Sequence, residues 1–104
     1  NKKLYKNTQT SAIIIHDHIK VISHSLLLVG IQEELQRQIT DVIIELSNDS
    51  WLWLINICNP SANYKKQILL QDQLSVRLRT QFTNLKERQR SMNINILLEG
   101  DFNN

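Results

Sequence analysis

The stretch YKKQILLQDQLSVRLRTQFTNLKERQRSMNINILL, residues Tyr64 to Leu98, decides the fold that the sequence predicts. Its seam residues recur at alternating intervals of three and four, the spacing that places side chains along one side of a helix. The predicted seam consists of Ile68, Gln71, Leu74 or Ser75, Leu78, Phe82, Leu85, Gln89, Met92 and Ile96. We therefore predict one long helix over residues 62–99, with Gly100 just after its end and a tail over residues 100–104.

Length and composition predict few, long elements. The chain has 104 residues, which is the size of one domain, and it contains only two glycines and one proline. Few such residues leave few places for turns, so we expect a single helical domain over residues 1–104. The net charge of +2 does not demand nucleic acid or an anionic membrane as a partner.

A second long helix is predicted over residues 11–47, preceded by a flexible arm over residues 1–10. The apolar side of this helix changes direction at Gly30, so the helix either breaks there or continues and buries its halves against different neighbours. We favour continuity, because a single glycine costs only about 1 kcal/mol in a helix. The β-branched runs at Ile13 to Ile15 and Val42 to Ile44 leave a strand alternative open.

A polar loop at Ser47 to Ser50 separates this helix from a short apolar segment over residues 51–58. The segment fits a two-turn helix or a short strand equally well, and we predict a short connecting helix. Its tryptophans, Trp51 and Trp53, would fill one end of the core and direct their indole nitrogens toward polar partners.

The predicted fold class is all-α: a long antiparallel helical hairpin with a short connecting helix. Two helices cannot cover all of this apolar surface, so we expect a four-helix bundle completed by dimerisation or by another helical subunit. The predicted interface residues are Ile15, Ile19, Ile22, Leu26, Trp51, Trp53, Leu78, Phe82 and Leu85. The predicted function is a non-enzymatic protein–protein interaction module, or a small structural or adaptor subunit of a larger assembly.

Basic residues in the last third of the chain give a nucleic-acid alternative. The candidate polyanion contacts are Arg77, Arg79, Lys86, Arg88 and Arg90. Projected onto a helix, they fall on both flanks of the apolar seam and do not form one basic face. The acidic Glu34, Asp41 and Glu45 would face the basic start of the second helix, so we favour charge matching within a bundle over nucleic-acid binding.

A second alternative comes from His16, which is followed by Asp17. A solvent-facing histidine before an acid resembles the phosphotransfer helices of sensor kinases, and the resemblance is limited to these two residues. It implies that His16 is a phosphoacceptor. His16 and His18 would point to nearly opposite sides of a helix, so we expect no shared metal ion.

No catalytic, cofactor or metal motif stands out in the sequence, and we predict that the protein is not an enzyme. Cys58 is the only cysteine, which excludes an internal disulfide and favours a reducing, intracellular compartment. The most apolar window, Ile13 to Ile31, is interrupted by charged residues and histidines. We therefore expect no membrane span.

Overall fold

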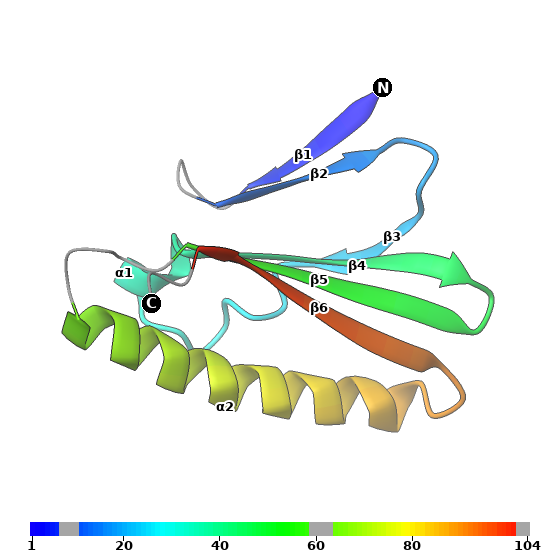
Figure 1. Cartoon of the computed structure of the whole chain (residues 1–104). Helices are drawn as coiled ribbons and strands as arrows, with labels where there is room; N and C mark the ends of the chain where they lie inside the picture. The colour runs from blue at the N-terminus through cyan, green and yellow to red at the C-terminus, as the bar shows by residue number, and fades with distance from the viewer. Residues whose placement is uncertain (7–10, 59–63, 102–104) are drawn as a thin grey trace.

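The computed structural model, which describes residues 1–6, 11–58 and 64–101, arranges the chain in three layers. A β-hairpin lies on one face of a larger sheet, and a long helix lies on the other face (Figure 1). The strands are β1 (Lys2–Lys6), β2 (Ala12–His16), β3 (Val21–His24), β4 (Ile39–Ser47), β5 (Ser50–Cys58) and β6 (Asn93–Asp101). The helices are α1 (Glu33–Gln36) and α2 (Tyr64–Arg88).

The larger sheet has the strand order β3-β4-β5-β6. Its first three strands are antiparallel, and β4 and β5 are joined by the tight turn at Asn48 and Asp49. The last strand, β6, runs parallel to β5. Parallel neighbours need a crossover connection, and α2 supplies it, which is why the long helix packs against the sheet.

The prediction of an all-α helical hairpin within a four-helix bundle is wrong. Residues 11–47 form β2, β3, the short helix α1 and β4, and residues 51–58 lie in strand β5. Strands β4 and β5 contribute side chains to the cores on both faces of the larger sheet, so they lack the apolar–polar alternation that marks a half-exposed strand. A segment rich in apolar residues also has some of them at intervals of three and four by chance, and this spacing is the one that predicts a helical seam. Gly30 breaks no helix; it lies with φ +86° in the connection between β3 and α1.

The long helix predicted over residues 62–99 is correct only for its first part. The helix α2 ends at Arg88, and the chain then turns back into β6, which takes in Gly100 and Asp101 of the predicted tail. Part of the predicted arm, Lys2–Lys6, is strand β1. The remaining predictions for residues 7–10, 62–63 and 102–104 lie outside the described residues.

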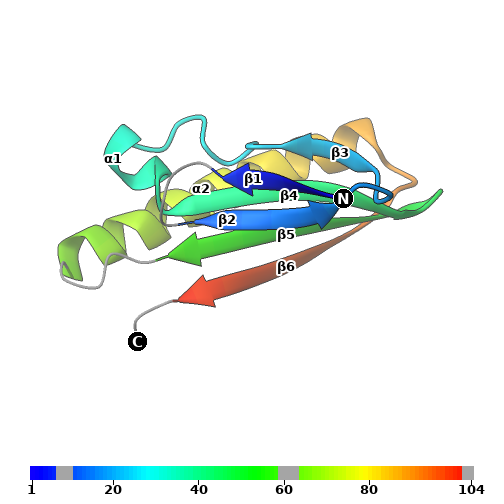
Figure 2. The ribbon, with the colours of Figure 1, turned by 90° about the horizontal axis from the view of Figure 1, so that it is seen from above.

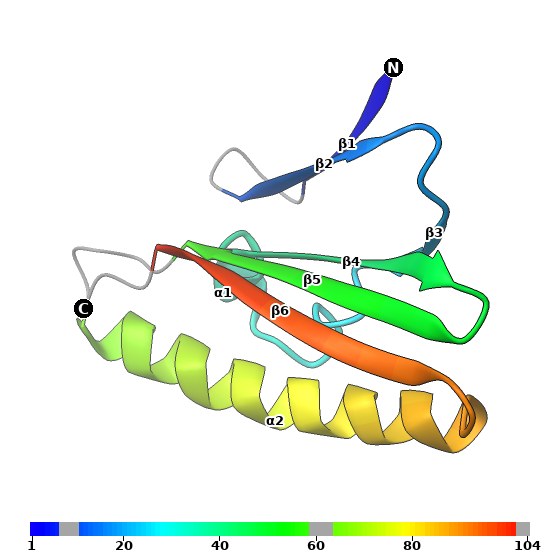
Figure 3. The ribbon, with the colours of Figure 1, turned by 45° about the vertical axis from the view of Figure 1, so that its right-hand side comes forward.

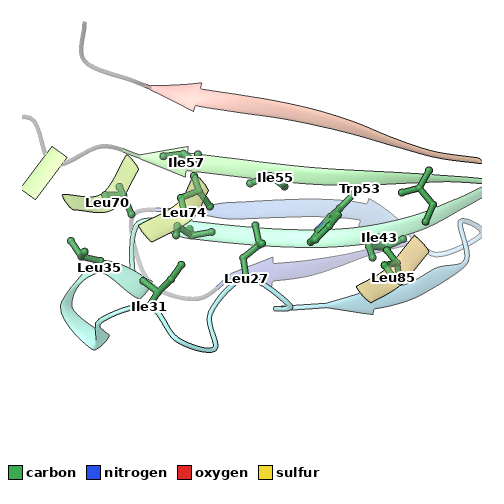
Figure 4. Packing of buried hydrophobic residues seen from close by; sticks show 12 residues of the cluster. Leu27, Ile31, Leu35, Ile43, Trp53, Ile55, Ile57, Leu70, Leu74 and Leu85 are labelled. Carbon is green, nitrogen blue, oxygen red and sulfur yellow. The ribbon is translucent and has the colours of Figure 1, made fainter. Parts of the chain in front are cut away.

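The main core lies between the larger sheet and α2. Side chains from β4 and β5 point toward leucines of α2 and of the connection before β4 (Figure 4). Its buried members are Leu27, Ile31, Leu35, Ile39, Ile43, Trp53, Ile55, Ile57, Leu70, Leu74, Leu85 and Ile94. A smaller core, formed by Ile15, Val42 and Ile44, lies between the sheet and the hairpin. Alternate residues of β4 thus belong to two different cores.

Candidate protein interaction edge

Strand β6 forms one edge of the larger sheet. Its nine residues pair with β5 along one side, and among the described residues no strand pairs with its other side (Figure 3). An edge strand presents unpaired backbone N–H and C=O groups along its free side. This edge is therefore a row of hydrogen-bonding groups that another extended chain could satisfy.

The side chains of β6 are apolar on both faces of the sheet. Ile94, Ile96 and Leu98 share the face that carries α2, because they stand in register with Trp51, Trp53 and Ile55 of β5. Leu97 points to the hairpin face, in register with Leu54.

Neither covering layer reaches far over this strand. The hairpin lies over the middle of the sheet, and β6 runs along the margin (Figure 2). Three consecutive side chains remain exposed as a result: Ile96 by 39%, Leu97 by 41% and Leu98 by 42%. Because consecutive residues alternate between faces, both faces of β6 offer apolar surface to the solvent.

Two other edge strands, β3 and β1, carry features that discourage pairing, and β6 does not. Strand β3 has only four residues and an irregular register against β4. Strand β1 carries three lysines. Over its length β6 has no proline, no basic residue and no register shift, and its acids are confined to Glu99 and Asp101 at one end. Short, irregular or lysine-bearing edges resist added strands, so β6 is a better candidate for an added strand than β3 or β1.

Gly100 allows β6 to follow β5 to its end. It has φ +134°, a backbone conformation that favours glycine, and a Cβ atom at this position would lie 1.8 Å from the carbonyl oxygen of Ile57. Any other residue at this position would have to displace the backbone of β5. The glycine therefore permits the close approach of β6 to β5 at this position.

A hollow lies beside β6 on each face of the larger sheet. On the helix side a groove of about 210 Å³ separates α2 from the strand and is lined by Gln71, Ser75 and Leu78 of α2 and by Leu98. On the hairpin side a hollow of about 220 Å³ lies between Ile13 of β2 and Leu97. The edge thus combines free backbone groups with apolar surface above and below it.

The buried carboxylate of Asp41 is a separate polar centre on the helix face of the larger sheet, the face shared by its β5 neighbour Ile55. Its oxygens accept hydrogen bonds from the amides of Leu26 at 2.9 Å and Leu27 at 3.2 Å, and from Nε1 of Trp53 at 3.0 Å. Burial raises the pKa of Asp41, and these three hydrogen bonds and the nearby His24 oppose that rise. Because its acceptor sites are directed at groups of the chain itself, we interpret Asp41 as a structural residue.

The predicted interface residues lie mostly inside the chain. Ile15, Trp53 and Leu85 are buried, the first in the hairpin core and the others in the main core. The remaining residues, Ile19, Ile22, Leu26, Trp51, Leu78 and Phe82, are partly buried and pack against one of the two cores. The apolar surface that the predicted bundle left over is thus largely covered by the chain's own layers.

The five basic residues do not gather on one face. Lys86 donates to the carbonyl oxygen of Met92 at 2.6 Å, and Arg77 lies against Gly30 in the loop before α1. Arg79 and Arg88 are exposed on α2, and Arg90 is exposed in the turn after it. Two of the five therefore take part in contacts within the fold.

His16 lies at the end of strand β2, so the helix on which its resemblance to phosphotransfer proteins depended does not form. The statement that His16 and His18 point apart is also wrong. The centroids of their rings lie 4.1 Å apart, because the chain turns directly after β2. Both histidines are exposed. Within the described residues no three His, Cys, Asp or Glu side chains group closely enough to hold a metal ion.

Sequence reasoning missed the edge strand because it extended the helical seam through Met92 to Ile96. A signal for a strand was present in the alternation Asn93, Ile94, Asn95, Ile96, which has the period of a strand with one apolar face. The three apolar residues that follow it restored a helical spacing and obscured this signal.

Comparisons with known proteins do not identify a family. No protein-family model matches the chain, and neither a curated protein nor a solved structure is similar to it. Among the helices of the described residues, none has the length and apolar character needed to span a membrane.

Proposed function

We propose that this chain is a non-enzymatic protein–protein interaction module that binds an extended polypeptide segment along β6. The observation that carries this proposal is the edge itself: nine residues with a free side, and three consecutive exposed apolar side chains on its two faces. Such an edge binds by strand addition, in which main-chain hydrogen bonds supply affinity and alternate side chains supply specificity.

The physical gain from an added strand has two parts. Backbone groups of β6 would exchange water for partner groups, and the side chains of Ile96, Leu97 and Leu98 would lose exposure. Burial of apolar surface contributes roughly 25 cal/mol per Å², so a partner with apolar residues at matching positions binds more tightly than a polar one. The partly exposed single cysteine, Cys58, fits a reducing, intracellular compartment as the place of this association.

A labelled nonapeptide with the sequence of β6, NINILLEGD, tests strand addition directly. We expect a saturable rise in fluorescence anisotropy when the full chain is added. A control peptide with proline in place of its central leucine should not bind, because proline removes a backbone donor and resists the ladder geometry. Equal signals from both peptides would refute the proposed function, as would the absence of a saturable signal from the first peptide at chain concentrations where sedimentation shows a monomer.

A further inference from the structure

We infer that the segment bound along β6 is the β6 strand of a second copy of this chain, paired antiparallel about a two-fold axis at Leu97. This inference rests on the proposed function and adds the identity of the partner and the register of pairing. With the axis normal to the sheet, both copies keep their helices on the same side and their hairpins on the other. The two sheets then join into one, and the pairing closes as a dimer.

The sequence of β6 is self-complementary in this register. Ile96 of one copy stands opposite Leu98 of the second copy, and Leu97 stands opposite its own counterpart. The acidic Glu99 lies opposite the amide Asn95. Directly opposite side chains have Cβ atoms about 4.5–5.5 Å apart, so like charges there would repel, and this register avoids them.

Neighbouring registers lose this match. An axis at Ile96 would place Asn95 opposite Leu97, and an axis at Leu98 would place Glu99 opposite Leu97. Each of these arrangements sets a polar group against an apolar one at the centre of the interface. Parallel pairing of the two edges would bring the acidic ends of both strands together, with Glu99 of one copy beside Glu99 of the other, where like charges repel. The antiparallel register at Leu97 is therefore the one that the residues favour.

The same register places the exposed apolar residues together. Ile96 and Leu98 of both copies meet on the helix face, beside the groove that Ser75 and Leu78 border. The two Leu97 side chains meet on the hairpin face of the sheet, where Leu97 is 41% exposed. Dimerisation thus covers both faces of the strand that the chain's own layers leave open.

Cysteine cross-linking in the full chain tests both the partner and the register, in a background with Cys58→Ser. We expect Leu97→Cys to form disulfide-linked dimers on mild oxidation, because this position meets its own counterpart. Asn95→Cys alone should not cross-link, since its two copies would lie about 14 Å apart, beyond the roughly 7 Å limit for a disulfide. A mixture of Asn95→Cys and Glu99→Cys should cross-link, because these positions stand opposite each other.

Val76→Cys is the matched control, because Val76 is an exposed apolar residue on α2, away from the edge. We expect at least a tenfold lower yield of dimer from it than from Leu97→Cys. Comparable yields would mean random collision and would overturn the inference, as would self-linking of Asn95→Cys. If circular dichroism shows that Leu97→Cys does not fold, the mixture of the two exposed polar positions decides the question by itself.

The outcomes separate the two proposals. If the labelled peptide binds and neither cysteine design cross-links above the control, strand addition stands and the second copy is not the partner. If neither the peptide nor the cysteine designs give a signal, both the proposed function and this inference are refuted.

Discussion

Asp41 shows how one buried residue connects several parts of the fold. Its carboxylate accepts the amides of Leu26 and Leu27, which fixes the loop after β3, and the indole of Trp53, which fixes the centre of β5. Removing one partner of a buried hydrogen bond leaves the other unpaired, at a cost of about 1–3 kcal/mol. The carboxylate thus supports the strand beside β6 without belonging to the interaction edge.

Replacing Asp41 with asparagine should destabilise the fold by about 1–3 kcal/mol, because the new amide nitrogen faces a backbone N–H. The variant should also lose the part of the pH dependence of the free energy of unfolding that comes from Asp41. Burial holds the pKa of Asp41 above its unfolded value, so the folded chain binds this proton more tightly. This tighter proton binding adds to the free energy of unfolding. The added contribution is fully present below the pKa of the unfolded chain, near 4, and it is lost as the pH rises through the raised pKa of the folded chain.

Urea unfolding of wild type and Asp41→Asn across pH 3 to 7 measures this effect. The difference in free energy of unfolding between the two proteins should be larger at the acidic end than at neutral pH. A difference that is constant, or that grows with pH, would contradict the assignment of a raised pKa to this residue.

At the scale of elements, α2 is the part of the fold that the sequence predicts best. One side of this helix faces solvent, so its apolar residues keep a helical period, and Leu74, Leu78, Phe82 and Leu85 of the predicted seam do pack on the core. The first residue of the predicted seam is wrong. Ile68 is 43% exposed, and the buried residue at the start of the helix is Leu70. Three consecutive apolar residues, Ile68 to Leu70, did not show which of them faces the sheet.

This placement predicts a contrast between neighbouring alanine substitutions. Leu70→Ala should lower the free energy of unfolding by about 2–5 kcal/mol, because it leaves a cavity in the main core. Ile68→Ala should change it by less than about 1 kcal/mol, because the side chain is largely in solvent. Denaturant unfolding at one fixed protein concentration measures both. Equal losses would show that the helix is rotated relative to the sheet.

The strands were harder to predict from the sequence, for a physical reason. Strand β4 contributes Ile43 to the main core and Val42 and Ile44 to the hairpin core, so its pattern carries no polar face. Its β-branched residues were the remaining signal, and they favoured the strand alternative. The turn at Asn48 and Asp49 was predicted correctly, because polar turn-forming residues mark a reversal whichever elements they join.

At the scale of the whole molecule, the layers cover the sheet unevenly. The hairpin and α2 bury the faces of β4 and β5, and the crossover through α2 brings β6 to the margin, outside the protection of the hairpin. The candidate interaction edge is therefore a product of topology. No single segment of sequence predicted it, because the free side of β6 depends on which strands lie next to each other.

The molecular mass in solution tests this account most directly. Sedimentation equilibrium over a range of concentrations should show the wild-type mass rising from that of the 12.2 kDa chain toward twice that value. Leu97→Lys should stay folded and monomeric, because a lysine is tolerated at this exposed position and two like charges would meet at the axis. Val76→Lys on α2 should associate as the wild type does. A wild-type chain that stays at 12.2 kDa throughout, or a Leu97→Lys variant that associates equally well, would contradict it.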